Sequence, residues 1–121
     1  MSQQRAIAFR AREQAILNAA EYLLLELGDE SITIEMIAER VGIAKGTIYK
    51  HFQSKDELIL QLLIAYESEL AVTMLEAAKS DDIAQIIQAY FSFHLSAPEK
   101  HVLFERLENK LAATRRTLRP Y

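Results

Sequence analysis

Lysine, arginine and hydrogen-bonding side chains are concentrated in one short stretch of this chain, residues 40–55. The stretch contains no Asp or Glu, although the whole chain carries a net charge of −3. Affinity for phosphate depends on where cations lie rather than on their sum over the chain. The stretch is therefore a candidate contact for a nucleic-acid backbone, and the alternative is an ordinary solvated face. Its basic residues are Arg40, Lys45, Lys50, His51 and Lys55.

The charge is divided unevenly along the 121 residues. Residues 1–55 carry seven Lys or Arg and seven Asp or Glu, whereas residues 56–121 carry seven against ten. A second acid-free segment precedes Glu13 and contains Arg5, Arg10 and Arg12. The basic groups that could meet DNA therefore belong to the first half of the chain.

Apolar residues recur at three- and four-residue steps along nearly the whole chain, which contains only three Gly and two Pro. This period is that of the α-helix, so we predict an all-α fold. The first helix is expected over about residues 10–27, with Gly28 as its C-terminal stop. A second helix begins after Thr33, whose side chain suits an N-cap, and ends at Gly42.

A short third helix follows Gly42, and a short helix, a glycine turn and another helix form the helix-turn-helix pattern. Three apolar residues of this segment can face inward: Ile43, Ile48 and Phe52. The remaining polar side chains then face outward or sideways, and they are Lys45, Thr47, Tyr49, Lys50 and His51. The pattern predicts a three-helix head that exposes a basic face.

The residues from Ser54 to Glu57 form a capping box, which predicts a fourth helix running to about Lys79. A fifth helix is expected from Ile83 to Leu95, and a sixth begins within residues 96–99. We therefore expect a helix-turn-helix domain over residues 1–55 and a short helical second unit over residues 56–121. No apolar run reaches 18 residues and no apolar block follows the N-terminus, so we expect no membrane span, no secretory signal and a cytoplasmic protein.

Nothing in the sequence predicts an enzyme. It contains no Ser/His/Asp or Cys/His set, no phosphate-binding loop and no cysteine. Its three histidines, His51, His94 and His101, lack the spacing of metal ligands, so we expect each to be hydrogen-bonded or solvated. We expect no metal and no cofactor.

The continuous stretch from Thr33 to Leu58 resembles the DNA-binding module of TetR-type transcriptional regulators, and with the preceding helix the resemblance covers about residues 10–63. In that family the third helix enters the major groove of DNA. The resemblance implies that Lys45, Thr47, Tyr49, Lys50 and His51 face DNA, that Gly46 lets a phosphate approach the backbone, and that Thr33 and Lys55 clamp phosphates. Tyr49 as a packing residue and His51 as a cap or core hydrogen bond are the alternatives.

The chain departs from that family in its second half. Such regulators carry a larger helical domain that binds a small ligand and dimerises through its last helices, whereas this chain ends after the sixth expected helix. We expect either a truncated form or fragment, or pairing through another surface, and an incomplete ligand pocket. Candidate pocket residues, which can equally be plain core, are Tyr66, Met74, Phe91 and Phe104.

The leading hypothesis is a repressor that binds double-stranded operator DNA as a homodimer and is released by a small-molecule effector in its full-length relatives. The alternative is a helical interaction module that acts by pairing with another chain. In either case the expected pairing surface is apolar, unless the same residues pack on the fourth helix. That surface comprises Ile87, Phe91, Leu103, Leu107 and Leu111.

Overall fold

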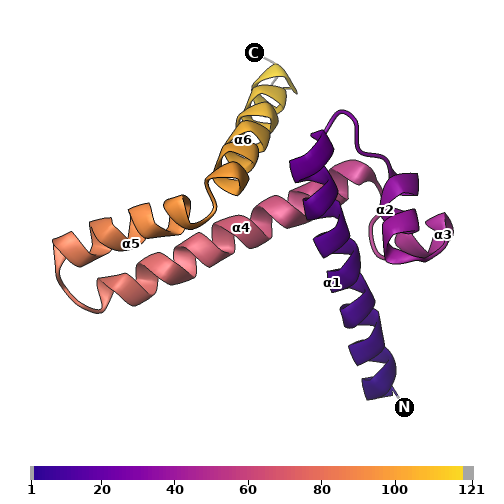
Figure 1. Ribbon diagram of the computed structural model, residues 1–121, viewed down its shortest axis with the longest axis horizontal. Coiled ribbons are helices and arrows are strands. Elements are labelled where there is room, and N and C mark those ends of the chain that lie inside the picture. Colours follow the sequence, from indigo (N-terminus) through magenta and orange to yellow (C-terminus); the bar gives the residue numbers. More distant parts are fainter. Residues whose placement is uncertain (1, 119–121) are drawn as a thin grey trace. The chain divides into compact units, whose positions relative to one another are not determined.

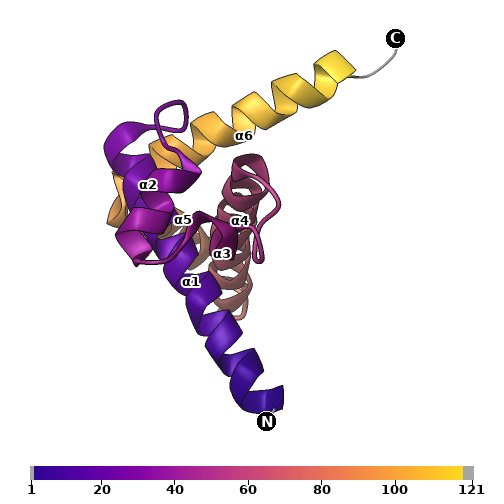
Figure 2. The same ribbon diagram turned by 90° about the vertical axis from the view of Figure 1, so that its right-hand side faces the viewer.

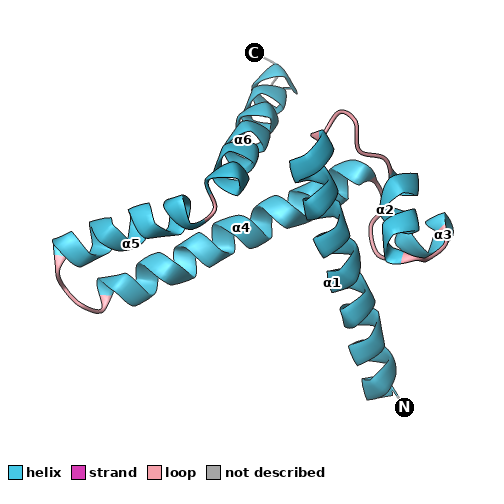
Figure 3. Cartoon of the chain, viewed as in Figure 1, coloured by secondary structure: helices cyan, strands magenta, loops and turns pink. Residues whose placement is uncertain are grey.

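The computed structural model describes residues 2–118, with side chains through residue 113, and within that range it has six α-helices and no strand (Figures 1 and 3). The expected all-α fold is confirmed. Two compact units meet inside the fourth helix, between Leu62 and Leu63, rather than after residue 55. The helices are α1 (Ser2–Leu27), α2 (Ile34–Val41), α3 (Lys45–Ile48), α4 (Lys55–Ala78), α5 (Ile83–Ser96) and α6 (Pro98–Leu118).

Helix α1 begins at Ser2, eight residues before the expected start at about residue 10. No Gly or Pro interrupts this segment, and its first turns have a tertiary partner because the ring of Phe9 stacks on that of His51 at a centroid distance of 4.0 Å. The predicted end is correct. Gly28 adopts a φ of 84°, and its N–H donates to the carbonyl of Leu24 at 2.9 Å.

The core of the first unit joins α1, α2, the α3 segment and the start of α4 (Figure 2, in which α2 and α3 face the viewer). The inward stripe of α1 packs on α2. Residues 43–52, called the α3 segment here because they contain α3 and its flanking turns, are held in place by the buried Ile48 and Phe52. Full burial of one such side chain contributes about 2–3 kcal/mol, so a four-residue helix is held by its neighbours rather than by its own hydrogen bonds. The buried residues are Ile16, Ala19, Ala20, Leu24, Ile32, Ile34, Ile37, Ala38, Ile48, Phe52, Leu58 and Leu62.

The second unit consists of the later turns of α4 together with α5 and α6. The expected cap of α4 is present, because Ser54 Oγ accepts from the Glu57 N–H at 3.1 Å. Helix α5 also begins with a cap, since the carboxylate of Asp82 accepts from the Ala84 N–H at 3.0 Å. Inside the unit, the ring of Tyr66 stacks on that of Phe104 at 4.7 Å. The fully buried Phe104 and the buried Tyr66 thus bring α4 and α6 together.

Within the described residues, one helix is long and apolar enough to cross a membrane by length and composition alone. It is α4, in which an 18-residue window has a mean hydropathy of 1.6. Our expectation rested on uninterrupted apolar runs and did not identify this window. The finding is weak evidence for a span, because core helices of soluble proteins meet the same criterion. Leu58 and Tyr66 of α4 are buried, although buried residues make up 22% of the window as a whole.

Candidate functional site

Helix α2 begins at Thr33, as expected. The Thr33 backbone is extended, and its Oγ1 accepts a hydrogen bond from the Met36 N–H at 3.2 Å. This bond satisfies one of the N–H groups that a helix start leaves unpaired. The residue remains exposed, so its capping role does not remove it from the surface.

The turn between α2 and α3 depends on Gly42. This residue adopts a φ of 85°, in the left-handed region that a side chain disfavours. Its N–H and that of Ile43 both donate to the carbonyl of Ala38, at 2.9 and 3.0 Å, which ends α2 and turns the chain sharply. The turn sets the direction in which α3 leaves.

The α3 segment divides into a buried side and an exposed side. Ile48 is fully buried and Phe52 nearly so, whereas Ile43 is half-buried. On the opposite side Tyr49 and Lys50 are exposed. Five of the predicted DNA-facing positions therefore lie together at the surface or half-buried: Lys45, Gly46, Thr47, Tyr49 and Lys50.

Gly46 lies on this exposed side, and the fold itself does not require a glycine there. A methyl group built on its Cα would meet no atom within 4 Å, and the residue does not have a positive φ. Glycine inside a helix costs about 1 kcal/mol relative to alanine. The open space above Gly46 is thus available for close approach by an outside group.

Lys45 is paired with a carboxylate from α2. Its Nζ lies 2.5 Å from Glu35 Oε2, and both side chains are well exposed. The hydrogen bond from Lys45 lowers the pKa of the Glu35 carboxyl, and the same bond raises the pKa of Lys45. A carboxylate from α2 therefore lies beside residues 40–55, although that stretch itself contains no Asp or Glu. Lys50, by contrast, is exposed and has no ion-pair partner among the residues described.

His51 lies on the buried side of the α3 segment. Its side chain is only 1% exposed, its Nδ1 lies 3.2 Å from Glu13 Oε2, and its ring stacks on Phe9. The implied DNA-facing role is therefore contradicted for this residue. The reason is that α1 begins earlier than expected and covers the imidazole.

The ammonium group of Lys55 is hydrogen-bonded to two backbone carbonyls. Its Nζ donates to the carbonyls of Asp29 and Ile32, at 2.9 and 3.0 Å, and so ties the start of α4 to the connection between α1 and α2. The expected phosphate clamp at Lys55 would share the ammonium group with these two bonds.

Arg40 lies over the ring of Tyr22, with its guanidinium carbon 3.6 Å from the ring centroid.

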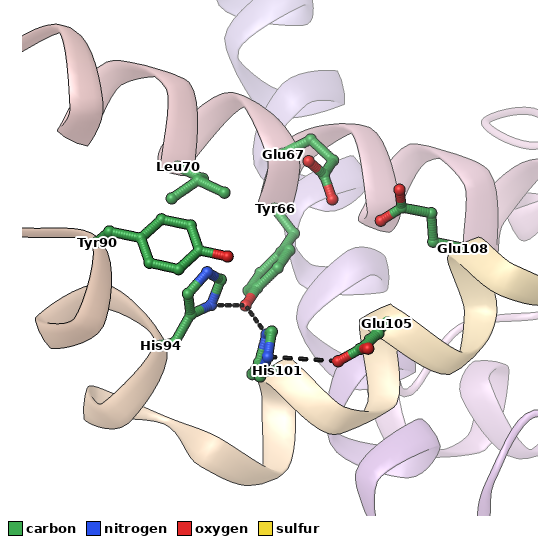
Figure 4. Close-up of a pocket in the computed structure, with 8 residues that line it drawn as sticks. All are labelled: Tyr66, Glu67, Leu70, Tyr90, His94, His101, Glu105 and Glu108. Carbon is green, nitrogen blue, oxygen red and sulfur yellow. Dashed lines mark hydrogen bonds and ion pairs between the residues drawn. The ribbon is translucent and has the colours of Figure 1, made fainter. Parts of the chain in front are cut away.

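A cavity of about 300 Å³ lies in the second unit (Figure 4). Of the four expected pocket residues only Tyr66 lines it. Phe104 is buried behind Tyr66, Phe91 is 57% exposed, and Met74 is half-buried elsewhere on α4, so the expectation is wrong for these three as lining of this cavity. The lining residues are Tyr66, Glu67, Leu70, Tyr90, His94, His101, Glu105 and Glu108.

The Tyr66 hydroxyl contacts both histidines that line the cavity. It lies 3.3 Å from His94 Nδ1 and 3.3 Å from His101 Nδ1, and His101 Nε2 lies 3.4 Å from Glu105 Oε2. Burial, followed by the neighbouring His101, lowers the pKa of His94, while Glu105 opposes the shift. This polar cluster was not predicted from the sequence, because the histidines were considered only as metal ligands. The pattern that could have indicated it is the helical spacing of polar residues, which places Tyr90 near His94 on one helix and His101 near Glu105 and Glu108 on the next.

The fold thus defines an all-α helix-turn-helix protein with a second helical unit. Residues 16–62 match the family model for bacterial regulatory proteins of the tetR family. The chain is 31% identical over 90 residues to the HTH-type transcriptional repressor AcnR of Corynebacterium diphtheriae, covering 74% of this chain and 43% of that protein. It is 42% identical over 52 residues to YdeS of Bacillus subtilis, an uncharacterized HTH-type transcriptional regulator, covering 43% of this chain and 26% of that protein.

A solved structure of a tetR family transcription regulator from Shewanella sp. PV-4 has a TM-score of 0.68 and 28% identity to this chain, covering 77% of this chain and 52% of that one. The chain is thus similar to tetR family regulators, and the family match lies within residues 16–62. It spans less than half the length of the two curated relatives named above.

Proposed function

We propose that this protein is a transcriptional repressor that binds double-stranded operator DNA through the exposed side of α3. The observation that carries the proposal is the surface formed by residues 45–50, where Lys50 has no ion-pair partner in the described part of the chain and Gly46 leaves open space. A lysine ammonium suits guanine acceptors or phosphate, and the neighbouring Thr47 and Tyr49 suit thymine methyls or phosphate. The proposed set comprises Thr33, Lys45, Gly46, Thr47, Tyr49, Lys50 and Lys55.

Lys45 enters the proposed contact with its charge already balanced by Glu35. On approach of a phosphate, the ammonium group would exchange one anionic partner for another. This exchange favours a positioning role for Lys45 and leaves Lys50 as the main source of attraction. We propose no catalytic role for the chain, and we propose a cytoplasmic location because the family model it matches describes bacterial regulatory proteins.

The test begins with selection of duplexes from a random pool, followed by a gel shift with the selected sequence. The expected result is a specific complex at least 10³-fold tighter than a scrambled duplex, with an affinity that falls steeply as salt increases. Equal affinity for selected and scrambled DNA, or none for either, would contradict the proposal.

We also propose a homodimer, because two small heads can read half-sites about 34–36 Å apart, or multiples of that distance. The expected pairing surface needs correction, since Leu103 and Leu107 are buried core residues. Ile87, Phe91 and Leu111 are exposed and remain in the proposal. Sedimentation of the wild type and of Phe91→Ser decides it: a dimer is expected for the first and a weakened dimer for the second.

The exposed apolar side chains of α5 and α6 also support the alternative, an interaction module that pairs with a different chain. Leu95 is 71% exposed and Val102 is 64% exposed. The gel shift separates the two functions, because an interaction module has no preference among duplexes. A small-molecule effector that releases the operator is proposed on the strength of the cavity in the second unit.

A further inference from the structure

We propose that the cavity formed by α4, α5 and α6 binds an organic cation, an amine or quaternary ammonium compound, with Glu67 and Glu108 as the countercharge (Figure 4). The inference rests on the proposed function and deepens it, since it names the chemical class of the effector.

The charge of the lining carries the inference. The charged side chains among the eight lining residues are three glutamates, and the others are two tyrosines, two histidines and a leucine. Glu67 comes from α4 and Glu108 from α6, and Figure 4 shows their carboxyl groups on the same side of the cavity. A ligand that enters between them meets negative charge from two helices.

A bound cation would stabilise the ionised forms of Glu67 and Glu108. Burial, followed by the charge of Glu108 and a hydrogen bond to it, raises the pKa of Glu67. The ionised form of Glu67 is therefore disfavoured, because its carboxylate lies close to that of Glu108. A bound positive charge takes the place that a shared proton would otherwise fill.

His94 does not supply the missing positive charge. The lowered pKa of His94 keeps its imidazole neutral near pH 7. His94 Nε2 is buried and has no hydrogen-bond partner among the described residues, which leaves an unmet polar atom in the wall of the cavity. If Nδ1–H donates to the Tyr66 hydroxyl, Nε2 is an acceptor that the N–H of an amine or the hydroxyl of choline can satisfy.

The carbon-rich part of the wall favours an organic cation over a metal ion. Tyr90 packs edge-on against His94 at a centroid distance of 4.4 Å, and Leu70 lines the cavity beside them. Aromatic and apolar surface stabilises alkyl groups and quaternary ammonium ions. Among the described residues, no group of three or more His, Asp or Glu is arranged to hold a metal. Lys100 lies over the Tyr66 ring at 5.7 Å but does not line the cavity.

The test compares choline with its neutral carbon isostere, 3,3-dimethyl-1-butanol, by calorimetry and by the imidazole NMR signals of His94 and His101. Choline is expected to bind at least about tenfold more tightly and to shift the His94 signal. The variant Glu67→Gln/Glu108→Gln should lose this preference. Glu76→Gln removes an exposed glutamate that pairs with Lys79 outside the cavity, so it should bind choline like the wild type.

Equal binding of choline and the alcohol, no binding of choline, or retention of the preference in the double variant would each overturn the inference. Circular dichroism confirms that the double variant is folded, which is expected because the change removes repulsion between Glu67 and Glu108. A gel shift keeps the two proposals separate. Failure of choline binding with intact operator binding contradicts only the effector class, whereas failure of operator binding contradicts the proposed function and leaves the choline titration readable.

Discussion

The buried imidazole of His51 is held by the carboxylate of Glu13, whose Oε2 lies 3.2 Å from His51 Nδ1. The two residues are 38 positions apart, so the bond fixes the early turns of α1 to the end of the α3 segment. Phe9 covers the same ring from α1. The exposed side of α3 is therefore positioned by a histidine that does not itself reach the surface.

Replacement of His51 by Ala should lower stability rather than remove a DNA contact. The side chain is 1% exposed, so the change leaves a cavity and an unpaired Glu13, and we expect a loss of about 2–4 kcal/mol in the free energy of unfolding. Urea denaturation measures it. His51→Phe keeps the stacked ring and should retain the base preference of the selected operator. A folded His51→Phe protein that loses discrimination at one base pair would show that His51 reads DNA.

The ammonium group of Lys55 should also be structural. Lys55→Met keeps the aliphatic stem and removes both bonds to the carbonyls of Asp29 and Ile32, so we expect a loss of about 1–3 kcal/mol in the free energy of unfolding. Lys50→Met is the matched control and should stay within about 0.5 kcal/mol of the wild type, because Lys50 is exposed. If the two variants have equal denaturation midpoints, the carbonyl bonds contribute nothing.

Gly46→Ala should separate folding from binding. The added methyl group meets no atom within 4 Å, and alanine is favoured in a helix by about 1 kcal/mol, so the protein should become slightly more stable. Operator affinity should nevertheless fall at least about tenfold, because the methyl group fills the space into which a phosphate would approach. Thermal unfolding and the gel shift are run on the same sample. Unchanged affinity would remove Gly46 from the interface.

Stability should fall in mild acid because of His94. Its pKa is lowered from 6.5, so the unfolded chain takes up the proton more readily than the folded one. The stability it contributes is complete above about pH 6.5 and is lost as the pH falls through the folded-state pKa. Its neighbours in the cavity are Tyr66 on α4, Tyr90 on α5, and His101 and Glu105 on α6. His94→Phe should flatten the fall in urea midpoint between about pH 7 and pH 5. An unaltered slope would assign the acid sensitivity to other groups.

Local signals explain how much of the fold was predictable. Thr33, Ser54 and Asp82 cap helices through residues two or three positions away, and Gly42 turns the chain by its own φ, so sequence alone identifies them. The candidate site was predicted less completely because its pairings are not local. Glu35 lies on another helix from Lys45, and Glu13 lies 38 residues from His51. Such charges cannot be matched before the helices are packed.

The cavity was the least predictable feature for the same reason. Its polar groups come from three helices, and Tyr66 meets His94 and His101 from 28 and 35 residues away. Aromatic residues at helical spacing indicated a core, which is correct for Phe104. They did not indicate that the walls would be acidic.

Operator affinity of Lys50→Ala, measured beside Lys79→Ala on the selected duplex, tests the central claim most directly. Both variants remove one exposed lysine, but Lys79 lies in the turn just after α4 in the second unit, where it pairs with Glu76. We predict that Lys50→Ala weakens specific binding by about 1–3 kcal/mol and relaxes discrimination at one base pair, whereas Lys79→Ala changes neither. Equal affinities for Lys50→Ala and the wild type, with the same base preferences, would contradict the assignment of α3 as the DNA-reading element.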